Sequence, residues 1–292
     1  MPYTVNGVSY TYRRPLYANT VGISACTDLP VSFLGPNLTG KALPNLNDVV
    51  LTEADGTTLL GNPGSGKFRG WWEAKTITAP VGHGQFDLAG GSAAELVAYI
   101  YYGGAGAADL TNQAGTYPTT WKGFWALNEA SGTLADATGN GHTGTAYGSL
   151  TYGAIGQVDG ALGFDGVNDY VNVPTLVPAG IFRAAHTMMG WASLTNWGRS
   201  RTMFGAGRQG GWVDCYVEID FSASDKRIWG RVRLDQGPSN VVPSILTYLN
   251  NSAQHHFALV VNAALAIVGF YIDGVLQGAN GTYSGTLNRL DA

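Results

Sequence analysis

The chain has 292 residues, and 42 of them are glycine, about double the average share of ~7%. Only 12% are charged, about half the average share of ~25%. Glycine at this density disfavours helix interiors, and 16 basic against 20 acidic residues leave no positive excess to neutralise phosphates. The composition therefore excludes helical repeats, coiled coils and nucleic-acid binders. It predicts an all-β fold of two domains, because domains average ~100 to 200 residues.

The amino-terminal part carries short β-branched or aromatic runs bounded by turn residues, which predict strands at Asp48–Thr52 and Glu95–Tyr102. The segment 103–120 has few large apolar residues and ends in a proline turn, so we place the domain boundary there, with domains at 1–116 and 117–292. Trp71, Trp72 and the run 99–102 exceed the aromatic surface that a small sandwich can bury, and this predicts a homo-oligomer or multi-copy assembly.

The segment GNPGSGKF at 61–68 matches the spacing of a phosphate-binding loop as far as Lys67. Phe68 stands where such a loop needs a hydroxyl for Mg²⁺, so the pattern favours a hairpin loop. The amino terminus lacks the apolar run of a secretory signal. The longest apolar segment, 257–272, is interrupted by Asn262 and is shorter than the ~20 residues that span a bilayer. We therefore expect no membrane association and two buried strands in this segment.

In the second half, the segment 214–234 predicts an antiparallel hairpin with one dry and one wet face. Pairing Phe221 with Lys226 in the expected register sorts the charges, Arg227, Arg231 and Arg233 among them, to one face and nearly every apolar residue, including Ile219 and Ile228, to the other. In this register Tyr216 faces Arg231 and Glu218 faces Trp229. The wet face around Tyr216, Trp229 and Arg231 is either a solubilising ladder of charges or a surface for a sugar or another partner.

Three stretches of the second half resemble laminin-G-like, concanavalin-A-like jelly-roll domains. They are GFWALNEASGTLADATGNGHTGTA, VDGALGFDGVNDYVNVP and QHHFALVVNAALAIVGFYIDGVLQG, and the likeness spans residues from 121 to the end of the third stretch. The resemblance implies a jelly roll of two packed sheets. The chain differs in having Gln254 where the family has Trp, and it stops before the strand with which the family closes its sheet. We expect that strand to be supplied by another chain, to be truncated or to be dispensable, and an open edge left by its absence would invite pairing with a neighbour.

Jelly rolls of this kind often hold Ca²⁺ in loops at the sheet rim, so the resemblance implies calcium ligands at matching loop positions. The candidates are Asp136, Asn140, Asn168 and Asp169. The alternative is that Asp and Asn occupy these turns because they tolerate left-handed backbone and cap it.

Catalysis is not expected. The segment EIDF at 218–221 resembles the start of the catalytic strand of jelly-roll β-glucanases, but Ser222 or Ala223 holds the position of the second carboxylate. Retaining hydrolysis needs both carboxyl groups. No serine lies in a nucleophile-elbow sequence, and the adjacent His255 and His256 point to opposite faces of a strand.

The first half resembles a β-sandwich module that precedes such jelly rolls, through TYRRPLYA, NDVVLTEADGTTLL and AYIYYGG. Such tandems are frequent in bacteriophage virion proteins and surface adhesins. The resemblance implies a non-enzymatic virion protein, a capsid decoration or tail-associated attachment protein, assembled in the host cytoplasm beside other virion proteins and able to bind host surface glycans. The alternatives are a carbohydrate-binding accessory module of a secreted enzyme or an extracellular bacterial adhesin, and a purely architectural protein.

Overall fold

A computed structural model provides the structure of the protein. It describes residues 3–61, 67–72, 77–78, 80–104, 107–157, 160–176, 185–194, 200–208, 215–222, 227–233, 240–243, 252–262, 267–277 and 281–282. Over these residues the protein is all-β, as expected, and its only helical element is a 3-10 turn at Ala114–Thr116. No helix in the described part of the chain is long and apolar enough to cross a membrane.

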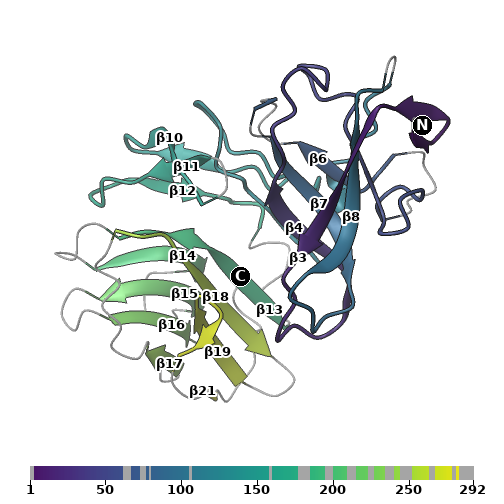
Figure 1. Ribbon diagram of the computed structural model, residues 1–292. Helices are drawn as coiled ribbons and strands as arrows, with labels where there is room; N and C mark the ends of the chain where they lie inside the picture. The colour runs from purple at the N-terminus through teal and green to yellow at the C-terminus, as the bar shows by residue number, and fades with distance from the viewer. Residues whose placement is uncertain are drawn as a thin grey trace. The chain divides into compact units, whose positions relative to one another are not determined.

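The chain divides into two compact units (Figure 1). The first comprises Met1–Trp125 and Asp136–Gly141, and the second comprises Ala126–Ala135 and His142–Ala292. The boundary expected between residues 116 and 117 stays a prediction.

The first unit is built from two three-stranded antiparallel sheets, β3–β8–β5 and β4–β7–β6, and a small hairpin β1–β2. Its strands are β1 (Tyr3–Val5), β2 (Val8–Tyr10), β3 (Tyr12–Ala18), β4 (Cys26–Leu34), β5 (Val50–Thr52), β6 (Gly70–Trp72), β7 (Val81–Leu88) and β8 (Glu95–Tyr102). The three segments that carry the resemblance of this half contribute β3, β5 and β8, which pair as one sheet.

Both sheets of the first unit contribute side chains to one hydrophobic core. Leu51 and Ile100 come from β5 and β8, and Trp72 and Phe86 come from β6 and β7. Tyr101 and Tyr102 are also buried there, with exposed fractions of 1% and 4%. The expectation that these aromatic residues exceed what the unit can bury was therefore wrong for Trp72, Tyr101 and Tyr102, because the core cluster of the first unit includes all three.

The second unit contains two larger antiparallel sheets, β13–β18–β19–β20 with β21 beside β19, and β14–β15–β16–β17, together with the strand pairs β9–β12 and β10–β11. Its strands are β9 (Thr145–Tyr147), β10 (Thr151–Ile155), β11 (Gly160–Gly163), β12 (Tyr170–Asn172), β13 (His186–Ala192), β14 (Arg201–Arg208), β15 (Cys215–Ser222), β16 (Arg227–Arg233), β17 (Asn240–Pro243), β18 (His255–Asn262), β19 (Ile267–Ile272), β20 (Val275–Leu276) and β21 (Gly281–Thr282). The two strands expected within residues 257–272 are confirmed as parts of β18 and β19.

The two larger sheets of this unit pack face to face. A Cβ atom placed on Gly230 of β16 would lie 2.7 Å from Leu259 of β18 and 2.9 Å from Phe270 of β19. Ile219 and Phe221 of β15 are fully buried against this layer. In Figure 1 the strands β14 to β17 follow one another in order along one layer. Leu259 and Phe270 therefore occupy the space that any side chain larger than hydrogen at position 230 would need.

The hairpin expected over 214–234 is present as β15 and β16, but its register differs from the expected one by two residues. Phe221 pairs with Ile228 and Ser222 pairs with Arg227, and Lys226 lies outside the described residues. The physical reason is that this register places the buried Phe221 opposite the buried Ile228 instead of opposite a lysine. Because the slip is even, each residue keeps its face, and the burial of Ile219 and Ile228 confirms the dry face.

Candidate functional site

The candidate site is the outer face of the sheet β14–β15–β16–β17, where Trp229 and Arg231 occupy alternate positions of β16. The residues between and beside them, Ile228 and Gly230, are buried against the other sheet. Trp229 and Arg231 are half-buried, and the guanidinium carbon of Arg231 lies 5.6 Å from the centroid of the Trp229 ring. A cation over an indole stabilises such a pair by ~0.5 to 1 kcal/mol at exposed sites. The two side chains therefore form a planar, partly apolar ledge with a fixed positive charge.

The backbone register supplies the neighbours of this ledge. Asp220 lies opposite Trp229, and Glu218 lies opposite Arg231. We call these four residues the Trp229 face. On the other side of β15, Glu218 pairs with Gly205 of β14, a position without a side chain. The sheet thus presents an indole, a guanidinium and two carboxylate-bearing positions in two adjacent rows.

Tyr216 occupies a different place from the one expected. It pairs with Arg233 and not with Arg231, because the register is shifted by two residues. It stays on the same strand and at an alternate position to the buried Ile219 and Phe221. Its side chain lies outside the described residues.

The Nε1 atom of Trp229 is shielded from solvent and has no hydrogen-bond partner among the described residues. An indole N–H buried in this way forgoes a hydrogen bond worth about 0.5 to 1.5 kcal/mol.

Two of the candidate calcium ligands lie in the first unit and stabilise turns. The Oδ1 atom of Asp136 accepts hydrogen bonds from the backbone N–H of Phe124 at 3.2 Å and from the N–H and hydroxyl of Thr138 at 3.0 and 2.7 Å. The amide nitrogen of Asn140 donates to the carbonyl oxygens of Trp121 and Lys122. These contacts are those expected of residues that cap turns.

The other two lie in the second unit. Both carboxylate oxygens of Asp169 accept backbone N–H groups, from Ser149 at 2.6 Å and from Asp165 at 2.9 Å, and Asn168 is exposed. Among the described residues no group of three or more His, Cys, Asp or Glu side chains is placed to hold a metal ion. Asp136 and Asn140 thus belong to the first unit, and Asn168 and Asp169 belong to the second.

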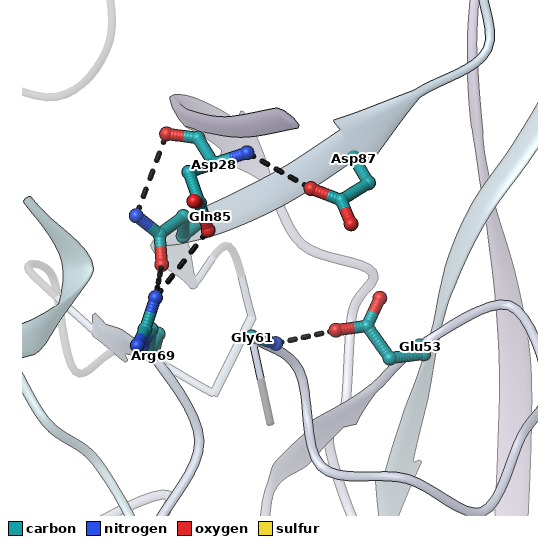
Figure 2. A network of polar contacts seen from close by, with 6 residues as sticks. All are labelled: Asp28, Glu53, Gly61, Arg69, Gln85 and Asp87. Carbon is teal, nitrogen blue, oxygen red and sulfur yellow. Dashed lines mark hydrogen bonds and ion pairs between the residues drawn. The ribbon is translucent and has the colours of Figure 1, made fainter. Parts of the chain in front are cut away.

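A polar network on the first unit, which the sequence analysis missed, surrounds an irregularity in β4 (Figure 2). Asp28 has a left-handed backbone, with φ of 56°, and the ladder with β7 shifts its register beside it. Its backbone N–H donates to Asp87 at 2.8 Å. Arg69 donates to Gln85 at 2.7 Å and to Asp28 at 3.3 Å. The network holds the bulged backbone in place, and a surface pair of this kind contributes at most about 1 kcal/mol.

Glu53 lies at the edge of the same network, and its carboxylate accepts the N–H of Gly61 at 2.5 Å (Figure 2). Burial raises the pKa of Glu53, the bond from Gly61 lowers it, and the nearby carboxylates of Asp87, Asp55 and Asp28 raise it further, for a net increase. Gly61 is the first residue of the glycine-rich segment, whose residues 62–66 lie outside the described residues. Its N–H group is bonded to a carboxylate of the protein itself.

Three histidines have polar partners that no sequence motif revealed. His83 lies 2.8 Å from the hydroxyl of Ser32, and its ring stacks on Trp71 with centroids 4.3 Å apart. It is only 3% exposed, so this contact is part of the packing of β4, β6 and β7. His142 contacts Thr175 at 3.0 Å, and His255 contacts Asp273 at 2.6 Å. Each partner is distant in the sequence, so no local motif could have indicated these contacts.

A pair of exposed tyrosines on β9 and β12 was not predicted from the sequence. Tyr147 and Tyr170 pair across the two strands, and their rings are stacked, with centroids 4.7 Å apart and an interplanar angle of 7°. Each segment alone indicates only a short strand. The signal that could have identified the pair is the cross-strand register, which joins residues 23 positions apart.

No protein-family model, curated protein sequence or solved structure matches the chain.

Proposed function

We propose that the protein is a non-enzymatic structural protein of a bacteriophage virion, a capsid decoration or tail-associated attachment protein, whose second half is a laminin-G-like jelly roll that binds host surface glycans. The observation that carries the glycan half of the proposal is the Trp229–Arg231 ledge on the outer face of a sheet whose inner face is buried. The virion half rests on the resemblance of both halves of the chain to tandem modules of virion proteins.

The Trp229 face has the groups that a sugar needs. The C–H face of a pyranose ring stacks on an indole, and its hydroxyls accept hydrogen bonds from a guanidinium and donate them to carboxylates. The half-buried indole and the guanidinium held 5.6 Å from it provide two of these groups in one place. Asp220 and Glu218 lie opposite them in the ladder.

A face of this kind is shallow, so a single copy binds weakly. Many copies on one particle compensate, because linked sites raise the effective affinity by ~10² to 10⁴ without new contacts. Display of many copies on a particle therefore suits such a site. In this proposal the first half attaches the protein to other virion proteins.

The test of the glycan half uses the full chain, multimerised on beads and applied to an array of bacterial surface glycans. Trp229→Ala should sharply weaken binding of the glycans that the multimer binds through this face, because it removes the stacking surface. The matched control is Trp191→Ala, which removes a 47% exposed tryptophan from the other sheet of the same unit and should leave binding unchanged. Failure of the multimer to bind any glycan, or full binding by Trp229→Ala, would contradict this half of the proposal.

The virion half is tested separately by immunogold labelling of purified particles. Label on the capsid or tail supports the proposal. Glycan binding by a protein that is absent from particles would instead indicate the accessory module or adhesin. Label on particles whose adsorption is unchanged by Trp229→Ala would indicate an architectural protein.

A further inference from the structure

The strand pair β9–β12 presents a face whose composition differs from that of the Trp229 face. The register places Thr145 opposite Asn172 and Tyr147 opposite Tyr170, and all four residues are exposed. Because residues two apart in a strand share a face, these four side chains share one side of the pair. The face therefore carries two aromatic rings, a hydroxyl and a carboxamide, and no charged group.

The two tyrosines form the apolar part of this face. They stack on each other and are still 43% and 52% exposed. Stacking of the two rings on each other contributes only ~0.5 to 1.5 kcal/mol beyond the area that it buries. A ligand that covered the part of each ring still exposed to water would add further hydrophobic stabilisation. Adjacent exposed aromatic rings beside polar groups are a feature of ligand sites.

An open depression of about 380 Å³ adjoins the face formed by these four residues, and Thr145 belongs to both the face and the depression. This volume lies within the range of small-molecule sites, ~300 to 1,000 Å³. The polar residues of its lining are Thr133, Thr145, Ser149 and Tyr152, and the other lining residues are glycine, alanine and leucine. No charged side chain lines it, so the depression suits a neutral ligand with hydroxyl groups and not an anion or a cation.

The turn that forms one wall of the depression is held in place. The backbone N–H of Ser149 donates to Asp169, and a Cβ atom on Gly148 would overlap the same carboxylate, at 2.2 Å. Gly148 also has φ of 88°, a conformation that favours glycine. On the opposite wall the hydroxyl of Tyr152 donates to the carbonyl of Gly132 at 2.6 Å. The depression is therefore preformed, and a ligand loses little free energy in ordering it.

We infer that the face formed by Thr145, Tyr147, Tyr170 and Asn172, with the adjoining depression, is a second ligand site that takes a neutral saccharide. A pyranose ring stacks on a tyrosine, a neighbouring ring occupies the depression, and the hydroxyls of Thr133, Thr145 and Ser149 with the amide of Asn172 bond the sugar. This site is distinct from the Trp229 face in residues and in charge, and it does not depend on the proposed function.

The experiment titrates the full-length protein with maltose, cellobiose, lactose and N,N′-diacetylchitobiose, followed by saturation-transfer NMR. At least one disaccharide should bind. Tyr147→Ala and Tyr170→Ala should each weaken that binding about tenfold, a change that corresponds to ~1.4 kcal/mol. The matched control is Tyr17→Ala, which removes a 62% exposed tyrosine of the first unit and should leave binding unchanged.

A second measurement does not depend on the folding of any variant. In the wild-type protein the ring-proton resonances of Tyr147 and Tyr170 should shift on titration, and those of Tyr17 should not. Absence of such shifts with all four sugars, or wild-type affinity in both alanine variants, would overturn the inference. Loss of binding in Trp229→Ala with wild-type binding in the tyrosine variants would leave the proposed function intact and refute this site alone.

Discussion

Replacement of the buried Asp48 should destabilise the first unit far more than replacement of the exposed Asp55. Asp48 is 2% exposed, and its two carboxylate oxygens accept the backbone N–H groups of Leu43 at 2.7 Å and of Gly103 at 2.9 Å. The second bond joins parts of the chain 55 residues apart. Burial, and then the charge of Asp48, raises the pKa of Tyr10 to about 12.

The expected magnitude follows from the number of donors left without an acceptor. Asp48→Ala removes the acceptor of two partly buried N–H groups, and each such group costs about 1 to 3 kcal/mol. Because both donors are only partly buried, the lower half of this range applies, and the free energy of unfolding should fall by roughly 2 to 4 kcal/mol. Asp48→Asn keeps one acceptor oxygen, so it should cost about half as much.

Asp55 provides the matched control, since it also accepts two backbone N–H groups, those of Thr57 and Thr58, at 2.8 and 2.9 Å. It is exposed, so water replaces it as acceptor, and Asp55→Ala should cost only about 0.5 to 1.5 kcal/mol. Hydrogen exchange of the β8 peptide, followed by mass spectrometry, reports the opening free energy of this unit within the full chain. Values for Asp48→Ala and Asp55→Ala that agree within about 0.5 kcal/mol would refute the role given to burial.

Two further predictions concern the second unit. Gly230→Ala should lower the free energy of unfolding by about 1 to 3 kcal/mol, because the new methyl group overlaps Leu259 and Phe270, and Leu259→Val in the same chain should restore part of the loss in urea unfolding. Burial raises the pKa of Asp273, but the bond from His255 and the N–H of His256 lower it more, so the net pKa lies below its usual value of 3.8. The folded state therefore favours the carboxylate, and its contribution to stability is present above pH 3.8 and lost as the pH falls through the lowered pKa. Unfolding of Asp273→Asn measured from about pH 5 to about pH 2 should lack this acid-side loss, and a curve parallel to that of the wild type would contradict the assignment.

Local patterns were sufficient to predict several strands. The run Glu95–Tyr102 was expected as a strand and forms β8 with the same bounds. The apolar segment interrupted by Asn262 forms β18 and β19, since the asparagine ends the first of them. These elements were predictable because strand formation in this chain depends on β-branched and aromatic residues bounded by turn residues.

The register of the β15–β16 hairpin was not predictable in the same way. A shift of two residues leaves every side chain on the same face, so the alternation of polar and apolar residues cannot distinguish the two registers. The burial of Phe221 opposite Ile228 decides between them. For the same reason the partner of Arg231 in the ladder is Glu218 and not Tyr216.

The amino-acid sequence by itself determined the all-β class and the two faces of the β15–β16 hairpin, because both depend on composition and on a period of two residues. Tertiary structure alone decided which distant residues meet. It stacks Tyr147 on Tyr170, joins Asp48 to Gly103 and packs Gly230 against Leu259. Such pairs arise when strands far apart in the chain align in one sheet or pack as two layers, and no local pattern encodes that alignment.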